Sequence, residues 1–461
     1  MEPRFKETDR HSLFLMPPSL EDWVPENHLA RFVVDIVSRL DLSPIRNSYA
    51  GRGSDAYPPG MMTALLFYSY ATGVFSSRKI ERGTYDSVAL RYIAVNTHPD
   101  HDTIATFRRR FLKELKSLFT QILLMAHEMG LMKLGSVSLD GTKIKANASK
   151  HHALSWEHAC KLEKQLKGEI EELLHKAQRA DQEDLPEGMD IPDELSRRES
   201  RLEAIAAAKV EIERRAAERF AKGQQEHQEK LADRQAKEKS TGKKPRGRAP
   251  KAPEPGPKSK DQVNLTDSES RIMPSSSGGF DQCYNAQAAV DVDSMLIVEN
   301  HITQQSNDKL ELGPAVENLC RLPGSLGRVE ALSADNGYFS QSNVEECEGE
   351  NIVPYIAVGR ERHNVSLEDR FTEPEPLLGL ADPVTEMKHR LQTMVGKAIY
   401  AKRKSTVEPV FGIIKAVMGF RQFLLRGLKK VAGEWDLVCI AYNLKRMYAL
   451  ECRGMSKNRG F

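Results

Sequence analysis

The stretch that decides the fold is Gly135–His151, GSVSLDGTKIKANASKH. On either side of Asp140 and Gly141, apolar residues alternate with polar ones, a pattern typical of β-strands. We interpret the two runs as a hairpin with a carboxylate at the end of its first strand. An Asp-Gly pair also forms tight turns that have no chemical role. The rest of the chain must therefore decide whether Asp140 is functional.

The same pattern returns far along the chain, in Val329–Tyr338, VEALSADNGY. Here a strand leads into Asp335, and a tight turn follows it. Two further strands are expected within Tyr284–Thr303, and helices separate the strands that follow, which predicts an α/β sheet. Ligands of such sheets bind where strands end, so two acids at strand ends indicate a site.

Glu408 is a third candidate acid. It precedes apolar residues at helical spacing, so it is expected near the start of a helix. Ser405 and Glu408 also fit a capping box, which is the structural alternative for this glutamate. Lys415 follows two turns later on the same helix face. Three carboxylates suffice to hold the Mg²⁺ or Mn²⁺ ions, two in number, that promote reactions at a phosphodiester. The cations Arg403, Lys404 and Lys415 would then hold the flanking phosphates.

Composition divides the chain into four predicted parts. Residues 1–130 read as short helices, either a DNA-binding bundle resembling a helix-turn-helix or a plain helical bundle. Residues 131–150 and 275–450 form the α/β domain. Residues 151–235 are highly charged with apolar residues every three or four positions, which predicts a helical or coiled-coil insertion. Residues 236–274 are rich in Pro, Gly and Lys, and we expect residues 236–262 to be a disordered basic linker. The basic residues that could face DNA in the first part are Arg78, Lys79, Arg82, Arg108, Arg109 and Arg110.

The overall composition favours a cytoplasmic protein that binds a polyanion. The 461 residues are 40% hydrophobic and 29% charged, with no signal peptide and no apolar run long enough to span a membrane. Six cysteines without a CxxC pair suggest neither a disulfide framework nor a zinc site. The net charge is only +2, yet residues 395–461 hold 14 Lys and Arg against 4 acids. Arg421 and Arg426 lie there among apolar residues, as on a folded surface that binds nucleic acid.

Several motifs together resemble the DDE transposases of bacterial insertion sequences, which have an RNase H-like catalytic core. The motifs are SLDGTKIKANAS, NLTDSESRIM, YNAQAAVD, QSNDKLEL, SADNGY and VEPVFGIIKAVMGFRQFLLRGL. Two N-terminal stretches resemble the helical domain of the same transposases, namely YPPGMMTALLFYSYATGVFSSRKIE and PDHDTIATFRRRF. The resemblance thus covers nearly the whole chain.

The resemblance implies roles for individual residues. Asp140, Asp335 and Glu408 would be the catalytic, metal-binding triad. In the family a tyrosine and an arginine precede the glutamate and a lysine follows it, which matches Tyr400, Arg403 and Lys415 as DNA-binding residues. Four residues separate Arg403 from Glu408, where the family commonly has three. Lys404 is therefore the alternative for the arginine.

The predicted function is a transposase that cleaves the DNA ends of its own element and joins them to target DNA. Its partners would be double-stranded DNA, both the terminal inverted repeats and the target, and it would act as a homodimer or higher oligomer in the bacterial nucleoid. Two alternatives stay open: a degenerate copy that only binds DNA or acts as a scaffold, and a metal-dependent nuclease without strand transfer.

Overall fold

The computed structural model describes residues 19–49, 55–180, 191–242, 247–275, 278–359, 372–377 and 382–458. Contacts divide the chain into two compact units. The first comprises residues 1–144, 285–425 and 429–461, and the second comprises residues 145–284 and 426–428. The predicted N-terminal part and most of the predicted α/β domain thus share one unit. The predicted insertion and linker lie in the other, together with residues 145–150, 275–284 and 426–428 of the predicted α/β domain.

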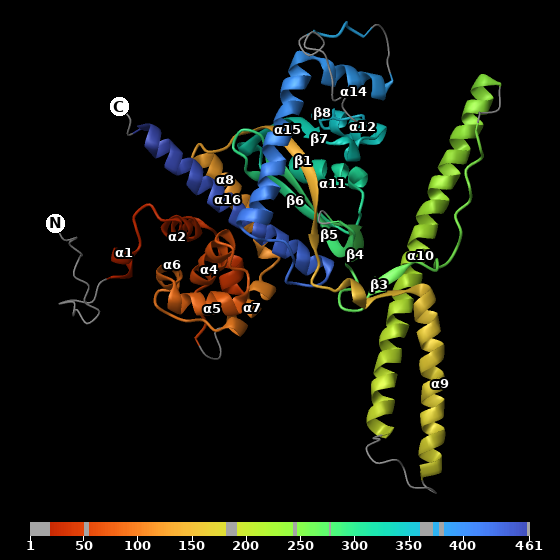
Figure 1. Ribbon diagram of the computed structural model, residues 1–461. Helices are drawn as coiled ribbons and strands as arrows, with labels where there is room; N and C mark the ends of the chain where they lie inside the picture. The colour runs from red at the N-terminus through yellow and green to blue at the C-terminus, as the bar shows by residue number, and fades with distance from the viewer. Residues whose placement is uncertain are drawn as a thin grey trace, which may run out of the picture. The chain divides into compact units, whose positions relative to one another are not determined.

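The strands that position the candidate site form one mixed sheet. They are β1 (Leu134–Lys145), β4 (Arg271–Pro274), β5 (Phe280–Asp291), β6 (Ile297–Thr303), β7 (Gly327–Ala334) and β8 (Val353–Ile356). The order is β4-β5-β1-β7-β8, and β6 also pairs with β5 (Figure 1). β5 and β6 are antiparallel, whereas β7 runs parallel to both β1 and β8. The prediction of an α/β sheet is confirmed.

The predicted hairpin around Asp140 is wrong, because β1 is one continuous strand of 12 residues. Its hydrogen bonds to β5 run from the amide of Val292 to the carbonyl of Ser136 and from the amide of Ala146 to the carbonyl of Gln282. These pairings advance in opposite directions along the two strands, so β1 and β5 are antiparallel. The second half of the predicted hairpin therefore continues the strand and does not turn back on it.

Short helices form the N-terminal part, as predicted. They are α1 (Leu20–Trp23), α2 (Leu29–Arg39), α3 (Ser43–Asn47), α4 (Pro59–Ala71), α5 (Ser77–Asp86), α6 (Val88–Ile93), α7 (His101–Arg110) and α8 (Glu114–Glu128). The pattern of residues 98–130 by itself predicts one long helix, but the structure has two, α7 and α8, because the chain leaves helical geometry between Phe111 and Lys113. α4 is buried along most of its length, so it belongs to the core.

The basic C-terminal segment is folded, as its apolar residues indicated. It contains α15 (Met394–Gly412), a π-helical turn (Ile413–Val417) and α16 (Leu428–Asn458), and α14 (Pro383–Gln392) precedes it. α16 buries Trp435 completely, and the indole N–H of Trp435 donates to the carbonyl of Gln287 on β5. α16 is therefore tied to the strand next to β1.

The helical arm, defined as α9 (Trp156–Ala180), α10 (Ile191–Thr241) and residues 247–261, forms most of the second unit. In Figure 1, α9 and α10 lie side by side, and α10 continues well beyond α9. β2 (Ala153–Ser155) and β3 (Gln262–Asn264) pair antiparallel at the base of the arm. The predicted paired helices are present.

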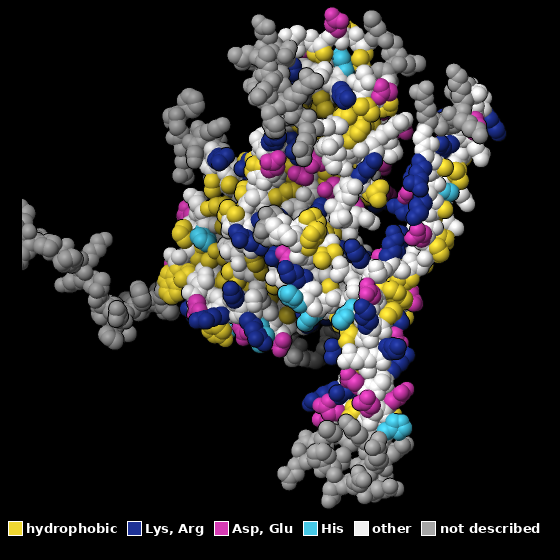
Figure 2. Space-filling view, turned by 45° about the vertical axis from the view of Figure 1, so that its right-hand side comes forward, with side chains coloured by type: hydrophobic (Ala, Val, Ile, Leu, Met, Phe, Trp, Pro, Cys, Tyr) yellow, Lys and Arg dark blue, Asp and Glu magenta, His cyan; other side chains and the backbone are white. Residues whose placement is uncertain are grey.

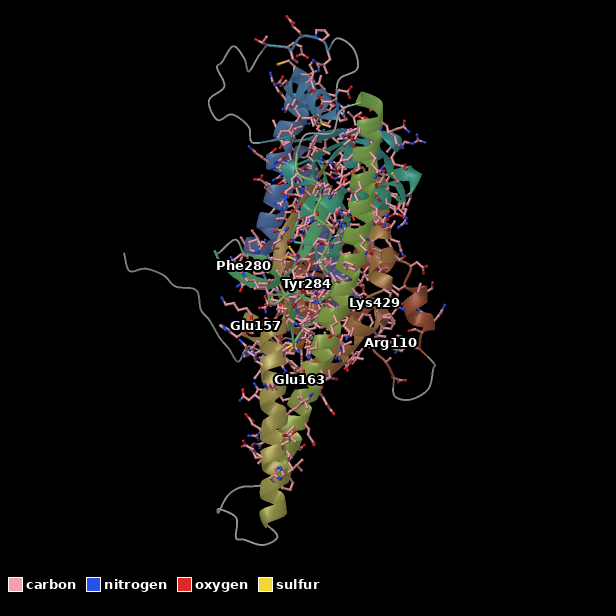
Figure 3. The ribbon with its side chains drawn as sticks, turned by 90° about the vertical axis from the view of Figure 1, so that its right-hand side faces the viewer. Arg110, Glu157, Glu163, Phe280, Tyr284 and Lys429 are labelled. Carbon is pink, nitrogen blue, oxygen red and sulfur yellow. The ribbon has the colours of Figure 1, made fainter. Side chains whose placement is uncertain are left out.

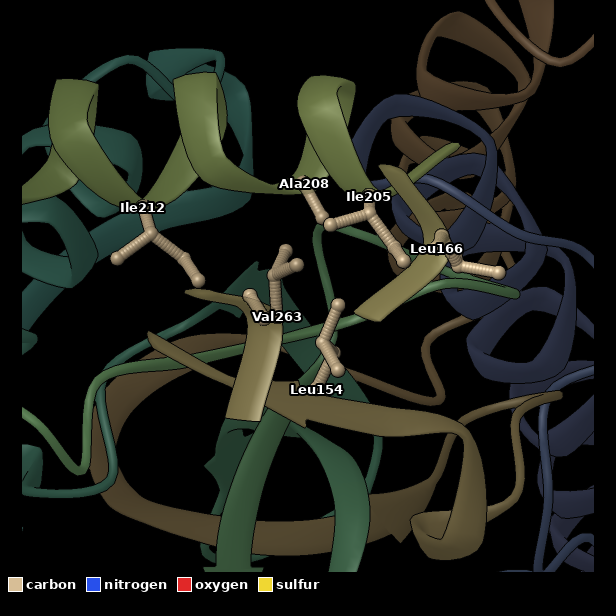
Figure 4. Close-up of a cluster of buried hydrophobic side chains, with 7 residues drawn as sticks. Leu154, Leu166, Ile205, Ala208, Ile212 and Val263 are labelled. Atoms are coloured by element: carbon tan, nitrogen blue, oxygen red, sulfur yellow. The ribbon is translucent and has the colours of Figure 1, made fainter. Parts of the chain in front are cut away.

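Both apolar packing and ion pairs hold the two arm helices together. Figure 4 shows a buried apolar cluster in which both helices pack against Leu154 of β2 and Val263 of β3. The helical members are Ala159, Leu166, Ile205, Ala208 and Ile212. Glu163, labelled on α9 in Figure 3, accepts from Lys209 of α10 at 2.7 Å. On the outside, Lys and Arg side chains alternate with acidic ones (Figure 2), as in the pair of Lys161 with Glu157 at 2.7 Å.

The prediction of a disordered linker over 236–262 differs from the structure. Residues up to 241 belong to α10, and residues 247–261 run back along that helix. His227 contacts the carbonyl of Pro250 at 3.1 Å, and Arg219 donates to Asp261 at 2.8 and 2.9 Å. Proline removes backbone donors but leaves carbonyls, so side chains of α10 can bind this segment without regular secondary structure.

A partly buried histidine joins β6 to the start of α11 (Leu312–Cys320). His301 contacts Glu299 at 2.9 Å and Glu311 at 3.3 Å. Burial alone would lower the pKa of His301, but the charge of Glu299 and the hydrogen bonds to both glutamates raise it to about 9. His301 is therefore protonated in the folded protein at neutral pH.

We expect the stability of the first unit to fall between about pH 6.5 and pH 9. A histidine with a raised folded pKa stabilises the fold fully below its unfolded pKa of about 6.5 and loses this contribution as the pH passes the folded pKa. The loss is on the order of 3 kcal/mol. Urea unfolding from pH 6 to 10 measures it, and His301→Gln should flatten the dependence. An equally steep dependence in His301→Gln would contradict the assignment.

Candidate catalytic site

Asp140 lies in the middle of β1, where its side chain is 20% exposed. Its Oδ1 accepts from the amide of Gly141 at 2.8 Å. A Cβ added to Gly141 would lie 2.2 Å from Nε2 of Gln287 and 2.6 Å from Oδ1 of Asp308. Glycine follows Asp140 because other side chains approach the strand closely at this point, and not because the chain turns.

Asp335 is placed beside Asp140 by the pairing of β1 with β7. Leu139 is paired with Ala334 in parallel register, so the next residue on each strand is an aspartate. Neighbouring strands are about 4.8 Å apart. Oδ1 of Asp335 accepts from the amide of Gly337 at 2.8 Å, which caps the short helical turn Asn336–Tyr338. The strand-end position predicted for Asp335 is confirmed.

Glu408 comes from the interior of α15 and not from a helix start. Ser405 donates its hydroxyl to the carbonyl of Lys402, so the capping-box alternative is wrong. Arg403, one turn earlier, donates from Nη1 to Asp140 at 3.3 Å and from Nη2 to Glu408 at 3.4 Å. The guanidinium is 9% exposed, whereas the carboxylate of Glu408 is 52% exposed. Arg403 thus contacts two acids that are far apart in sequence, Asp140 and Glu408.

The site carries an excess of negative charge around Asp140. Burial raises the pKa of Asp140 to about 6, and the charges of Asp335 and Asp308 act in the same direction. The hydrogen bond from Gly141 and the charge of Arg403 oppose this shift. One guanidinium therefore does not fully offset the cost of keeping these carboxylates together.

The other predicted DNA-binding residues lie on or after α15. Tyr400 has its ring 5.9 Å from the Arg403 guanidinium, and Lys404 is exposed. Lys415, in the π-helical turn, donates to the hydroxyl of Thr142 and to the carbonyl of Lys143 on β1. The site thus brings together Arg403 and Lys415 with the acids, and leaves Lys404 at the surface.

Arg421 and Arg426 have separate surroundings. Arg421 is exposed and donates to the carbonyl of Lys415 at 3.0 Å. Arg426 belongs to the second unit, where it donates to the carbonyl of Asn147 at 3.0 Å. Of these two arginines, Arg421 is therefore the one that is hydrogen-bonded to a residue of the site, Lys415.

Asp140, Asp335 and Glu408 offer only hard oxygen donors, and these suit Mg²⁺ or Mn²⁺. Among the residues that the structure describes, no three His, Cys, Asp or Glu side chains are arranged to hold a metal ion. Arg403 occupies the space between Asp140 and Glu408. The donor chemistry and the surplus negative charge fit divalent cations, provided that the guanidinium moves from this position.

Sequence reasoning missed four polar residues that surround the acids: Lys143, Asn285, Gln287 and Asp308. Asn285 and Gln287 are fully buried on β5, which is apolar around them. Two long polar side chains in a buried strand were the available signal, because buried polar groups need partners. Oδ1 of Asn285 is buried without a hydrogen-bond partner, so the network still has an unused acceptor near the site.

The N-terminal basic residues divide into exposed and buried ones. Arg78, Lys79 and Arg82 are exposed on α5. Arg108 is buried, which makes it unsuited to bind DNA, and it donates to the hydroxyl of Tyr70 at 2.9 Å. The remaining two, Arg109 and Arg110, are exposed at the end of α7, and Arg110 is labelled in Figure 3.

Comparison with known families identifies both ends of the chain. Residues 18–110 match a family described as "Transposase domain (DUF772)", and residues 372–448 match one described as "Transposase DDE domain". The second match contains Glu408 and Lys415. No curated protein and no solved structure matches the chain significantly. None of the described helices is long and apolar enough to cross a membrane. Transposase families are thus matched at the N-terminal and C-terminal parts of the chain, and these two matches support a DDE transposase of an insertion element.

Proposed function

We propose that this transposase cleaves DNA at the ends of its own insertion element and joins the freed ends to target DNA. The observation that carries the proposal is the meeting of Asp140 and Glu408 on Arg403, next to the strand end that bears Asp335. The arrangement of the sheet supports an RNase H-like core, since β5 runs antiparallel to β1, β6 runs antiparallel to β5, and β7 and β8 run parallel to β1.

Asp140, Asp335 and Glu408 would hold one or two Mg²⁺ or Mn²⁺ ions. Such ions activate an attacking oxygen and stabilise the leaving oxygen of a phosphodiester. Arg403 keeps Asp140 and Glu408 close together and relieves part of their repulsion until the ions bind. Lys415 ties the end of α15 to β1 through Thr142 and Lys143, which fixes Glu408 relative to Asp140.

DNA would approach over the exposed part of α15 and the segment after it, where Tyr400, Lys404 and Arg421 lie. Arg403 and Lys415 would contact phosphates if the acids held metal, and Arg426, in the second unit, is a separate proposed DNA contact. Exposed cations on α5 offer a second basic surface, formed by Arg78, Lys79 and Arg82. Lys and Arg contacts to phosphates give affinity that falls with salt. Binding of two element ends favours a dimer or higher oligomer.

A strand-transfer assay tests the proposal. Pre-cleaved duplexes from the element ends are mixed with the protein, Mg²⁺ and a supercoiled target plasmid. A transposase yields joined products, whereas a simple nuclease only nicks the plasmid and a degenerate copy only binds. Glu408→Gln serves as the control for contaminating nucleases. Cleavage by Glu408→Gln at the parent rate would exclude this glutamate from the chemistry.

A further inference from the structure

Asp308 is a fourth carboxylate beside the site, at the start of the turn Asp308–Leu310. Its Oδ1 accepts from Asn285 at 2.6 Å, from Gln287 at 2.8 Å and from Lys143 at 3.2 Å. Its Oδ2 accepts from Lys143 at 3.3 Å. Both oxygens are thus engaged by side chains from β1 and β5. Such a carboxylate has little capacity left to bind a metal ion.

Gly141, directly after Asp140, leaves room for Asp308, and Gly337, two residues after Asp335, lies near Asp308. At Gly141, an added Cβ would meet Oδ1 of Asp308 at 2.6 Å, well below van der Waals distance. At Gly337, an added Cβ would lie 3.9 Å from Cβ of Asp308. Asp308 therefore packs against the backbone just after Asp140 and also against the turn that follows Asp335.

A second connection runs through Gln287. This side chain donates to Asp308, and its Oε1 accepts from the hydroxyl of Tyr338. Tyr338 is fully buried and ends the turn that Asp335 caps. Asp308 is thus linked to β1 by Lys143 and to the Asp335 turn by Gln287 and Tyr338.

We infer that Asp308 is a positioning residue that sets the separation of Asp140 and Asp335. It acts through Lys143, Gln287 and close packing against Gly141, and not as a ligand. The inference rests on the proposed function, because that separation matters only if the two aspartates share metal ions. Residues that orient metal ligands typically contribute 10- to 100-fold to metal affinity or activity.

The test compares Asp308→Asn with Glu330→Gln, an exposed acid on β7, in the full-length protein. Mn²⁺ affinity is measured by electron paramagnetic resonance, and cleavage of element-end DNA is measured as turnover at saturating DNA and as KM. Asparagine keeps the shape but turns one acceptor into a donor that faces Lys143 and the amides. We expect Mn²⁺ affinity and turnover to fall by about 10- to 100-fold, with KM for DNA unchanged and Glu330→Gln like the parent.

Two results with the Asp308→Asn variant would overturn the inference. If the Asp308→Asn variant binds Mn²⁺ and cleaves DNA as Glu330→Gln does, the separation of Asp140 and Asp335 does not depend on Asp308. Loss of one bound Mn²⁺ with the remaining one held at parental affinity would make Asp308 a ligand instead.

If Asp308→Asn does not fold, Lys143→Met removes one donor and should lower Mn²⁺ affinity in the same direction. A parent protein that neither binds Mn²⁺ nor cleaves DNA would instead refute the proposed function.

Discussion

Asp335→Asn should abolish DNA cleavage and strand transfer while DNA binding is retained. Asparagine preserves Oδ1, which accepts from the amide of Gly337, so the turn after β7 should keep its geometry. The substitution removes a negative charge and one hard oxygen donor, both of which the metal ions need. The loss should exceed the roughly 10- to 100-fold that residues orienting metal ligands contribute, because Asp335 would itself be a ligand. Cleavage of labelled element-end duplexes in Mg²⁺ measures the loss, and gel shifts measure binding.

The matched control is Glu345→Gln, which neutralises an exposed acid on α12 (Gln341–Gly349). This variant should cleave and bind as the parent does. If Asp335→Asn cleaves DNA in Mg²⁺ at the parent rate, Asp335 only forms the turn and the proposed triad is wrong. Simultaneous loss of binding would indicate that the substitution disturbs the fold around β7.

Arg108→Met should lower the free energy of unfolding by about 3–5 kcal/mol, the cost of removing one partner of a buried charged network. Arg108 donates to the hydroxyl of Tyr70 and to the carbonyl of Phe75 at 3.0 Å. Tyr70 in turn donates to Glu434 of α16 at 3.3 Å. Burial raises the pKa of Glu434, and the charge of Arg108 opposes this shift. Without the arginine, Glu434 keeps a buried carboxylate that has lost its nearby positive charge.

The neighbouring Arg109 provides the comparison, since it is exposed on the same helix. Arg109→Met should change the free energy of unfolding by less than about 0.5 kcal/mol, as surface substitutions usually do. Urea unfolding followed by circular dichroism compares the two variants. Equal stability of Arg108→Met and Arg109→Met would mean that the buried network contributes nothing to the free energy of unfolding.

The sequence predicted the end of β7 before Asp335 and the end of β6 at Thr303, because apolar runs there are bounded by turn residues. It failed at Gly141, since glycine signals both a turn and a close approach, and only the folded chain brings Asp308 and Gln287 to that point. It also misplaced the start of α15. Ser405 and Glu408 have the spacing of a cap, but the preceding residues, from Met394 onward, continue the helix, and local spacing does not reveal this.

Composition predicted the paired helices of the arm but not the path of the segment after them. Leu166, Ile205 and Ile212 recur at helical spacing and form the buried contact. By contrast, residues 247–261 have no periodicity, and their place depends on long-range contacts with α10, such as that between Arg219 and Asp261. Contacts of this kind leave no local trace in the sequence.

The pairing of β1 with β5 has a consequence for the order of folding. These strands adjoin the beginning and the end of the second unit, so residues 147–281 form the connection of one long antiparallel pair. A longer connection adds to the entropic cost of closure, and long-range strand pairing is slow. The pairing of β2 with β3 brings the two ends of that connection together early. We therefore expect the arm to fold first and to speed the pairing of β1, the strand that carries Asp140, with β5.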